Sequence, residues 1–153
     1  MRGALAALVG VFVLLAAGCG GGSSARLSET EFQSQANAIC AKYEKQLNAL
    51  GSPTSLDEIP DLVDKALAIL NKEIDEIADL NPPEEFQDQF DSMLAASDKT
   101  KQAADDLSSA AKAGDQAAVQ KALEEGNAAS SQADQIAGEL GLNSCKGPVG
   151  GGG

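Results

Sequence analysis

The chain has 153 residues, the size of a single domain with short flanking segments, and it is acidic, with 23 Asp and Glu residues against 11 Lys and Arg. A net charge of −12 without a cluster of basic residues repels nucleic acid, so nucleic acid is excluded as a partner. The chain contains no histidine, which removes histidine zinc sites, histidine haem ligation and the usual general base. We therefore expect no metal, no cofactor and no enzymatic activity.

Residues 1–18 have the layout of a secretory signal peptide. Arg2 supplies a positive charge, and an unbroken apolar run follows from Ala4 to Gly18. A helix of about 15 residues is about 22 Å long, shorter than the ~30 Å hydrocarbon core of a membrane. The sequence therefore predicts an export signal in preference to a permanent transmembrane helix.

The apolar run ends at Cys19 in the letters LAAGC, which resemble the lipobox of bacterial lipoproteins, although Ala16 stands where the strongest form has leucine. The resemblance implies cleavage before Cys19 and attachment of fatty-acyl chains, such as palmitate, to this cysteine. Two such chains would hold the protein stably at the extracytoplasmic face of the cell membrane. The alternative is ordinary secretion with a free Cys19 thiol. Residues 19–26, which are rich in Gly and Ser, are expected to form a flexible tether.

The chain has three cysteines, and the assignment of Cys19 to lipid leaves Cys40 and Cys145. Because exported proteins fold in an oxidising compartment, we predict a disulfide between them. The chain-entropy argument gives such a bond, closing about a hundred residues, a stabilisation of up to ~4.7 kcal/mol. The alternative, in which both cysteines bind a metal, lacks a histidine or a third cysteine to complete the ligand set.

Apolar residues at helical spacing predict four helices, over about 28–50, 57–80, 83–113 and 115–141. Ser28 and Glu31 match a capping box at the start of the first helix. Pro60 must lie in the first turn of the second helix, and Pro83 fits the first position of the third.

Short turns join these helices, and no alternation typical of a strand occurs in the sequence. We therefore predict an all-α, antiparallel up-down-up-down four-helix bundle over residues 27–146, with a disordered tail over 147–153. The expected inner face of the fourth helix includes Leu123. To bring Cys145 to Cys40, the chain must reverse at Gly141 and run back across the first helix.

Acidic residues gather on the second helix and at the start of the third, in three groups: Asp57, Glu58, Asp61 and Asp64; Glu73, Asp75, Glu76 and Asp79; Glu84, Glu85, Asp88 and Asp91. We interpret these groups as solvated helix faces. The alternative is a site for a hard cation such as calcium, although a convex helix face rarely supplies six converging oxygens.

Several stretches besides the lipobox are similar to those of small helical lipoproteins of high-GC Gram-positive bacteria. They are ANAIC ending at Cys40, LNPP over 80–83, and GELGLNSC over 138–145. This resemblance implies export and a helical architecture, and it carries over no functional residue other than Cys19.

Two functions are compatible with these features. The first is a binding or interaction module that contacts an envelope protein or a small ligand through a groove between helices. The alternative is a structural spacer of the envelope without a ligand. An apolar pocket between the first and second helices would favour binding, whereas a filled core would favour the spacer.

Overall fold

The structure is a computed structural model that describes residues 25–147. The predicted signal peptide over 1–18, the predicted lipidation site Cys19 and residues 148–153 of the predicted tail lie outside the described residues. The described part is all-α, as predicted, and none of it forms a strand. It consists of α1 (Glu29–Asn48), η1 (Leu56–Glu58), α2 (Ile59–Ala78), η2 (Glu84–Phe86), α3 (Gln87–Ala113), α4 (Gln116–Glu139) and η3 (Asn143–Cys145), where η marks a short 3-10 turn.

Helix α1 begins at the predicted capping box. The Glu31 N–H donates to Ser28 Oγ at 3.4 Å, and the Ser28 N–H donates to the Glu31 carboxylate at 3.0 Å. These reciprocal bonds satisfy two backbone donors that the first turn of a helix leaves unpaired. Hydrogen bonds from the Ser28 side chain and backbone also lower the pKa of Glu31.

The start of α3 differs from the prediction. Pro83 is extended, with φ −52° and ψ 150°, and the 3-10 turn η2 separates it from α3, so it is not the first residue of the α-helix. The preceding loop is instead held by the N-terminal segment, because the Leu27 N–H donates to the Asn81 carbonyl at 2.8 Å and Arg26 donates to the Pro82 carbonyl at 2.9 Å. Tertiary contacts therefore decide this helix start, whereas Pro60 lies in the first turn of α2 as predicted.

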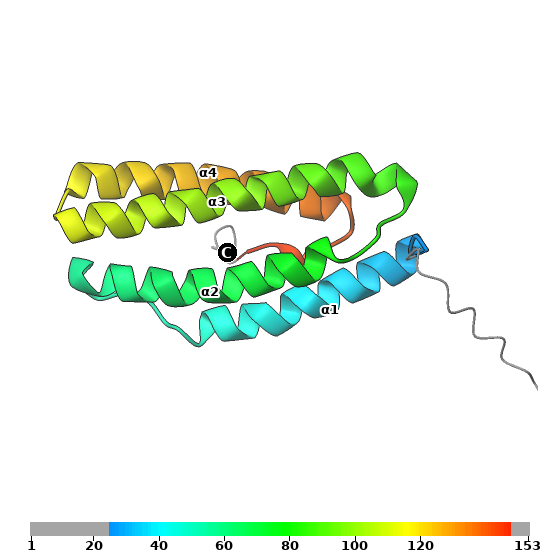
Figure 1. Ribbon diagram of the computed structural model, residues 1–153, viewed down its shortest axis with the longest axis horizontal. Coiled ribbons are helices and arrows are strands. Elements are labelled where there is room, and N and C mark those ends of the chain that lie inside the picture. Colours follow the sequence, from blue (N-terminus) through cyan, green and yellow to red (C-terminus); the bar gives the residue numbers. More distant parts are fainter. Residues whose placement is uncertain (1–24, 148–153) are drawn as a thin grey trace, which may run out of the picture.

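The four helices form two antiparallel pairs, α1 with α2 and α3 with α4, and successive helices run in opposite directions (Figure 1). α2 packs on α3, and the most extensive contact is that between α3 and α4. No α-carbon of α1 lies within 8 Å of one in α4. The returning segment 142–147 runs between the two pairs and contacts both α1 and α4 through η3 (Figure 1).

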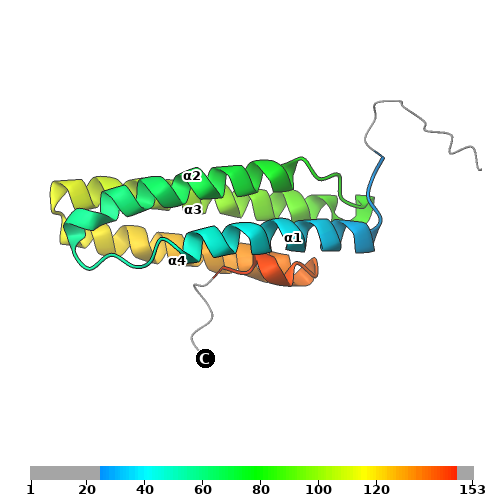
Figure 2. The ribbon, with the colours of Figure 1, turned by 90° about the horizontal axis from the view of Figure 1, so that it is seen from below.

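α1 covers only one part of the bundle. Both views show that α2, α3 and α4 continue well beyond the C-terminal end of α1 (Figures 1 and 2). α1 has 20 residues against 27 in α3 and 24 in α4, and it ends before the break at Gly51, where φ is 74°. One end of the bundle is therefore built from four helices and the other from three.

Two clusters of buried side chains form the core. The larger one lies at the four-helix end and includes Phe32, Phe90 and Leu140, with the rings of Phe32 and Phe90 packed edge to face at 5.4 Å. The smaller one joins Ala110, Ala111 and Val119 near the turn between α3 and α4. The prediction that Leu123 faces the core was wrong, because 46% of it is exposed. Near Leu123, the buried residues of α4 are Val119 and Ala122, and α3 is the helix that α4 packs against.

Polar contacts join α1 to α2 at the edge of the larger cluster. Lys42 Nζ lies 2.6 Å from Glu76 Oε1, and the Tyr43 hydroxyl donates to the same oxygen at 2.5 Å. The hydrogen bonds from Lys42 and Tyr43 lower the pKa of Glu76, and the bond to Glu76 raises the pKa of both partners. Glu76 is therefore a cross-helix partner and not only part of a solvated acidic face.

Candidate functional site

The reversal after α4 positions the C-terminal segment. Gly141 has φ 76°, and the Leu142 N–H donates to the Ala137 carbonyl at 2.7 Å, which is the main bond of a Schellman cap. The side chain of Asn37 on α1 then binds the returning backbone twice, since it donates to the Gly141 carbonyl at 3.1 Å and accepts the Ser144 N–H at 2.7 Å. The predicted reversal at Gly141 is confirmed.

A disulfide joins Cys40 to Cys145, as predicted, across a sequence separation of 105 residues, and their α-carbons are 4.9 Å apart. Cys40 lies in the larger core cluster and is 1% exposed. The bond fixes the returning segment against the middle of α1.

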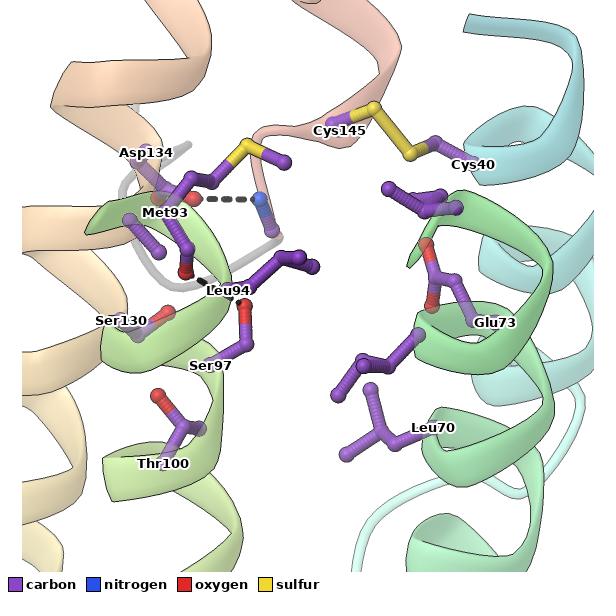
Figure 3. A pocket seen from close by; sticks show the side chains of 14 residues that line it. Cys40, Leu70, Glu73, Met93, Leu94, Ser97, Thr100, Ser130, Asp134 and Cys145 are labelled. Carbon is purple, nitrogen blue, oxygen red and sulfur yellow. Dashed lines mark hydrogen bonds between the residues drawn. A yellow bond between two sulfur atoms is a disulfide. The ribbon is translucent and has the colours of Figure 1, made fainter. Parts of the chain in front are cut away.

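A cavity of about 120 Å³ lies between α2, α3, α4 and this returning segment, next to the disulfide (Figure 3). Its walls are mainly apolar, because α2 and α3 turn leucine, isoleucine and methionine side chains toward it. The lining residues are Cys40, Leu70, Glu73, Ile74, Ile77, Met93, Leu94, Ser97, Thr100, Ser130, Ala133, Asp134, Cys145 and Gly147. Larger hollows, of about 420 to 430 Å³, are lined mostly by exposed side chains, so this smaller cavity is the better candidate site.

The two hydroxyls that α3 contributes to the cavity wall are bonded to the backbone of α3 itself. Ser97 donates to the Met93 carbonyl at 3.0 Å, and Thr100 donates to the Ala96 carbonyl at 3.2 Å. On the α4 side, the carboxylate of Asp134 accepts the Gly147 N–H at 2.9 Å (Figure 3). Asp134 thus holds the end of the returning segment and presents a negative charge at the cavity.

Glu73 faces Asp134 across the cavity, from α2, and is partly buried (Figure 3). Burial raises the pKa of its carboxyl from 4.5 to about 7, and the negative charge of Glu44 on α1 contributes. The interpretation of Glu73 as part of a solvated face was wrong. Its position three residues after Leu70 and four before Ile77 places it on the apolar face of α2, and this spacing was the signal available in the sequence.

Asp134 was not singled out from the sequence, where it looks like one more acid in a polar stretch of α4. Its role depends on Gly147, which reaches it only because the chain reverses at Gly141. No local pattern around Asp134 indicates this contact.

The other acidic residues of the three groups, apart from Glu76, are exposed. Between residues 25 and 147, no group of three or more Asp, Glu, Cys or His side chains is arranged to hold a metal ion. In the same range, no helix has both the length and the hydropathy needed to cross a membrane.

The cavity is not where the sequence suggested. It lies between α2 and the α3–α4 pair, with the disulfide at its edge, and α1 contributes only Cys40 to its lining. No protein-family description, curated protein or solved structure matches this chain.

Chemically, the cavity offers apolar walls, two carboxylates and three hydroxyl side chains, which suits reversible binding of a small molecule with an apolar body.

Proposed function

We propose that this protein is a lipid-anchored binding protein at the extracytoplasmic face of the cell membrane, and that the cavity beside the Cys40–Cys145 disulfide is its ligand site. The observation that carries the proposal is the cavity itself. A spacer needs only a filled core, whereas here an apolar space of about 120 Å³ remains among partly buried residues of three helices. An engineered cavity of about 150 Å³ with apolar walls binds benzene, so this volume suits a single ring or a short chain.

The way the chain enters the bundle is compatible with an anchor at Cys19. Arg26 and Leu27 are tied to the loop between α2 and α3, so the tether leaves the bundle at that end. Arg26 follows Cys19 by seven residues, so the two lie at most about 25 Å apart when the chain is extended. With Cys19 in the membrane, the loop at Pro82 would face the lipid surface, and the turn at Gly114 would be distal.

Mass spectrometry of protein extracted from membranes tests the anchor. We expect a chain that begins at an acylated Cys19, and a Cys19→Ser variant that is released from the membrane fraction. A membrane-bound protein that retains residues 1–18 without acylation would contradict the lipoprotein assignment.

A cavity-filling substitution tests the ligand site. Ala133→Leu places added carbon atoms in the cavity, so it should abolish binding of small apolar probes, such as benzyl alcohol, detected by amide chemical-shift changes at Leu70, Leu94 and Ser130. Ala117→Leu on the exposed face of the same helix is the matched control and should bind normally. If the unmodified protein shows no shifts with any small probe, the binding function is refuted and the spacer function replaces it.

A further inference from the structure

The cavity has an unbalanced charge. Its lining contains the carboxylates of Glu73 and Asp134 and no Lys or Arg. The two acids come from opposite walls, α2 and α4, and both are directed toward the interior (Figure 3). A ligand held between them therefore meets negative charge on two sides.

Glu73 has no ion-pair partner among residues 25–147, where the three salt bridges join Lys42 to Glu76, Lys101 to Asp98 and Lys121 to Glu125. A partly buried carboxylate without a counter-charge is costly, and a bound cation would remove most of this cost. The pKa of Glu73, about 7, is consistent with this lack of a counter-charge, because desolvation and the negative charge of Glu44 both disfavour the ionised carboxylate.

The charged groups around Glu73 do not supply the missing cation. Glu44 of α1 and Lys146 of the returning segment share with Glu73 a second hollow, of about 90 Å³, that adjoins the cavity. The Lys146 side chain, however, lies along α4, where its Nζ would be 3.2 Å from a Cβ added at Gly138. Asp134 faces Glu73 from α4. The charged residues near Glu73 on α1 and α4, Glu44 and Asp134, are therefore both acids.

The carboxylate of Asp134 can accept a hydrogen bond from a ligand. Its Oδ1 accepts the Gly147 N–H at 2.9 Å, which fixes the orientation of the carboxylate. An ionised carboxylate has about four acceptor positions, so capacity remains for an ammonium N–H. Leu70, Ile74 and Leu94 supply apolar contact, and Met93 can adapt to the shape of a ligand.

From this arrangement we propose that the cavity binds a small organic cation, with its ammonium group between Glu73 and Asp134 and its apolar body against α2 and α3. The inference rests on the proposed ligand site and names the class of ligand. A bare inorganic cation fits less well, because apolar walls cannot replace the oxygen ligands that such an ion loses on dehydration.

A matched series of probes tests the charge requirement on the full mature protein. Benzylammonium, benzyl alcohol and benzoate have the same ring and differ in charge. At pH 8, calorimetric titration should show benzylammonium binding at least about tenfold more tightly than benzyl alcohol, because charge-assisted hydrogen bonds are the stronger ones, and benzoate binding weakest. Below pH 7, where Glu73 is protonated, the affinity for benzylammonium should fall.

Two substitutions connect the preference to the residues. Glu73→Gln and Asp134→Asn should each weaken benzylammonium binding by about tenfold and change benzyl alcohol binding by less than about twofold. Glu124→Gln, at an exposed site on α4, is the control and should change neither.

The outcomes separate the two proposals. If benzyl alcohol binds as tightly as benzylammonium and Glu73→Gln has no effect, the cation inference is overturned while the cavity keeps its function. If calcium displaces benzylammonium at matched ionic strength, with the same dependence on Glu73, an inorganic ion replaces the organic one. If no probe binds at all, the proposed function fails together with the inference.

Discussion

The side-chain amide of Asn37 holds the backbone of Ser144, which is 107 residues later in the chain, by accepting its N–H at 2.7 Å. The same amide donates to the Gly141 carbonyl at 3.1 Å, so one side chain on α1 binds both ends of the turn that follows α4. This turn is what directs the C-terminal segment into the space between α1 and α4. Asn37 therefore helps to build one wall of the cavity without lining it.

Replacement of Asn37 by alanine should destabilise the protein. It leaves a partly buried backbone N–H at Ser144 and a carbonyl at Gly141 without their side-chain partner, which costs about 1–3 kcal/mol of the free energy of unfolding. Urea unfolding followed by circular dichroism measures the loss. Gln46→Ala, at an exposed site on the same helix, is the control and should have an effect within about 0.5 kcal/mol. Equal effects of the two substitutions would show that Asn37 does not hold the turn.

The disulfide between Cys40 and Cys145 should stabilise the domain by restricting its unfolded chain. Because the bond closes a loop across a separation of 105 residues, its reduction should lower the free energy of unfolding by about 2–4 kcal/mol and the melting temperature by about 10 °C. A Cys40→Ser, Cys145→Ser double variant should melt at the temperature of the reduced protein and show no further response to reductant. If the reduced and oxidised proteins have the same melting temperature, the disulfide does not stabilise the domain.

Most of the helices could be predicted because their start and stop signals are local. The pair Ser28 and Glu31 lies within one turn, and Gly114 followed by Asp115 provides a left-handed stop and a new cap in adjacent positions. The pairing of Cys40 with Cys145 could also be predicted, since a single pair remains once Cys19 is assigned to lipid. These signals need no knowledge of the tertiary structure.

The cavity could not be predicted because it depends on contacts between distant segments. Its lining combines side chains of α2, α3 and α4 with Cys145 and Gly147 of the returning segment, and the path of that segment does not follow from the helical spacing alone. The same dependence explains Leu123, which has the spacing of a core residue but lies where no helix covers it. Glu73 was classed with its acidic neighbours by composition, although its position relative to Leu70 and Ile77 puts it on the apolar face.

The glycine at position 141 should be required for the reversal. An alanine there would have an unfavourable φ of 76°, and its Cβ would lie 2.5 Å from Gln33 Nε2, which donates to the Leu140 carbonyl. We expect Gly141→Ala to lower the free energy of unfolding by about 2 kcal/mol, from backbone strain and the loss of that hydrogen bond.

Gly114→Ala provides the matched control for the glycine substitution. Gly114 has a similar φ of 67°, but no atom lies within 4 Å of its added Cβ, so only the strain of about 1 kcal/mol applies. Chemical unfolding of both variants measures the difference. If the two substitutions destabilise the protein equally, Gln33 does not restrict the turn at Gly141.

The raised pKa of Glu73 should make stability depend on pH. Between 4.5, the ordinary value for its carboxyl, and about 7, the folded protein retains a proton that the unfolded chain has released. The free energy of unfolding therefore falls as the pH rises through this window and is level above it. Glu76, whose pKa is lowered, acts in the opposite sense and loses its stabilising contacts only as the pH falls below 4.5.

Glu73→Gln should remove this dependence, because glutamine keeps the shape of the side chain without its charge. We expect the variant to be more stable than the unmodified protein by about 1–2 kcal/mol at pH 8, after allowance for the partial exposure of Glu73, and equally stable near pH 4.5. Glu124→Gln, on the exposed face of α4, should follow the pH profile of the unmodified protein. Thermal melts from pH 4.5 to pH 8 measure all three proteins. A Glu73→Gln profile parallel to that of the unmodified protein would show that folding does not raise the pKa of the Glu73 carboxyl.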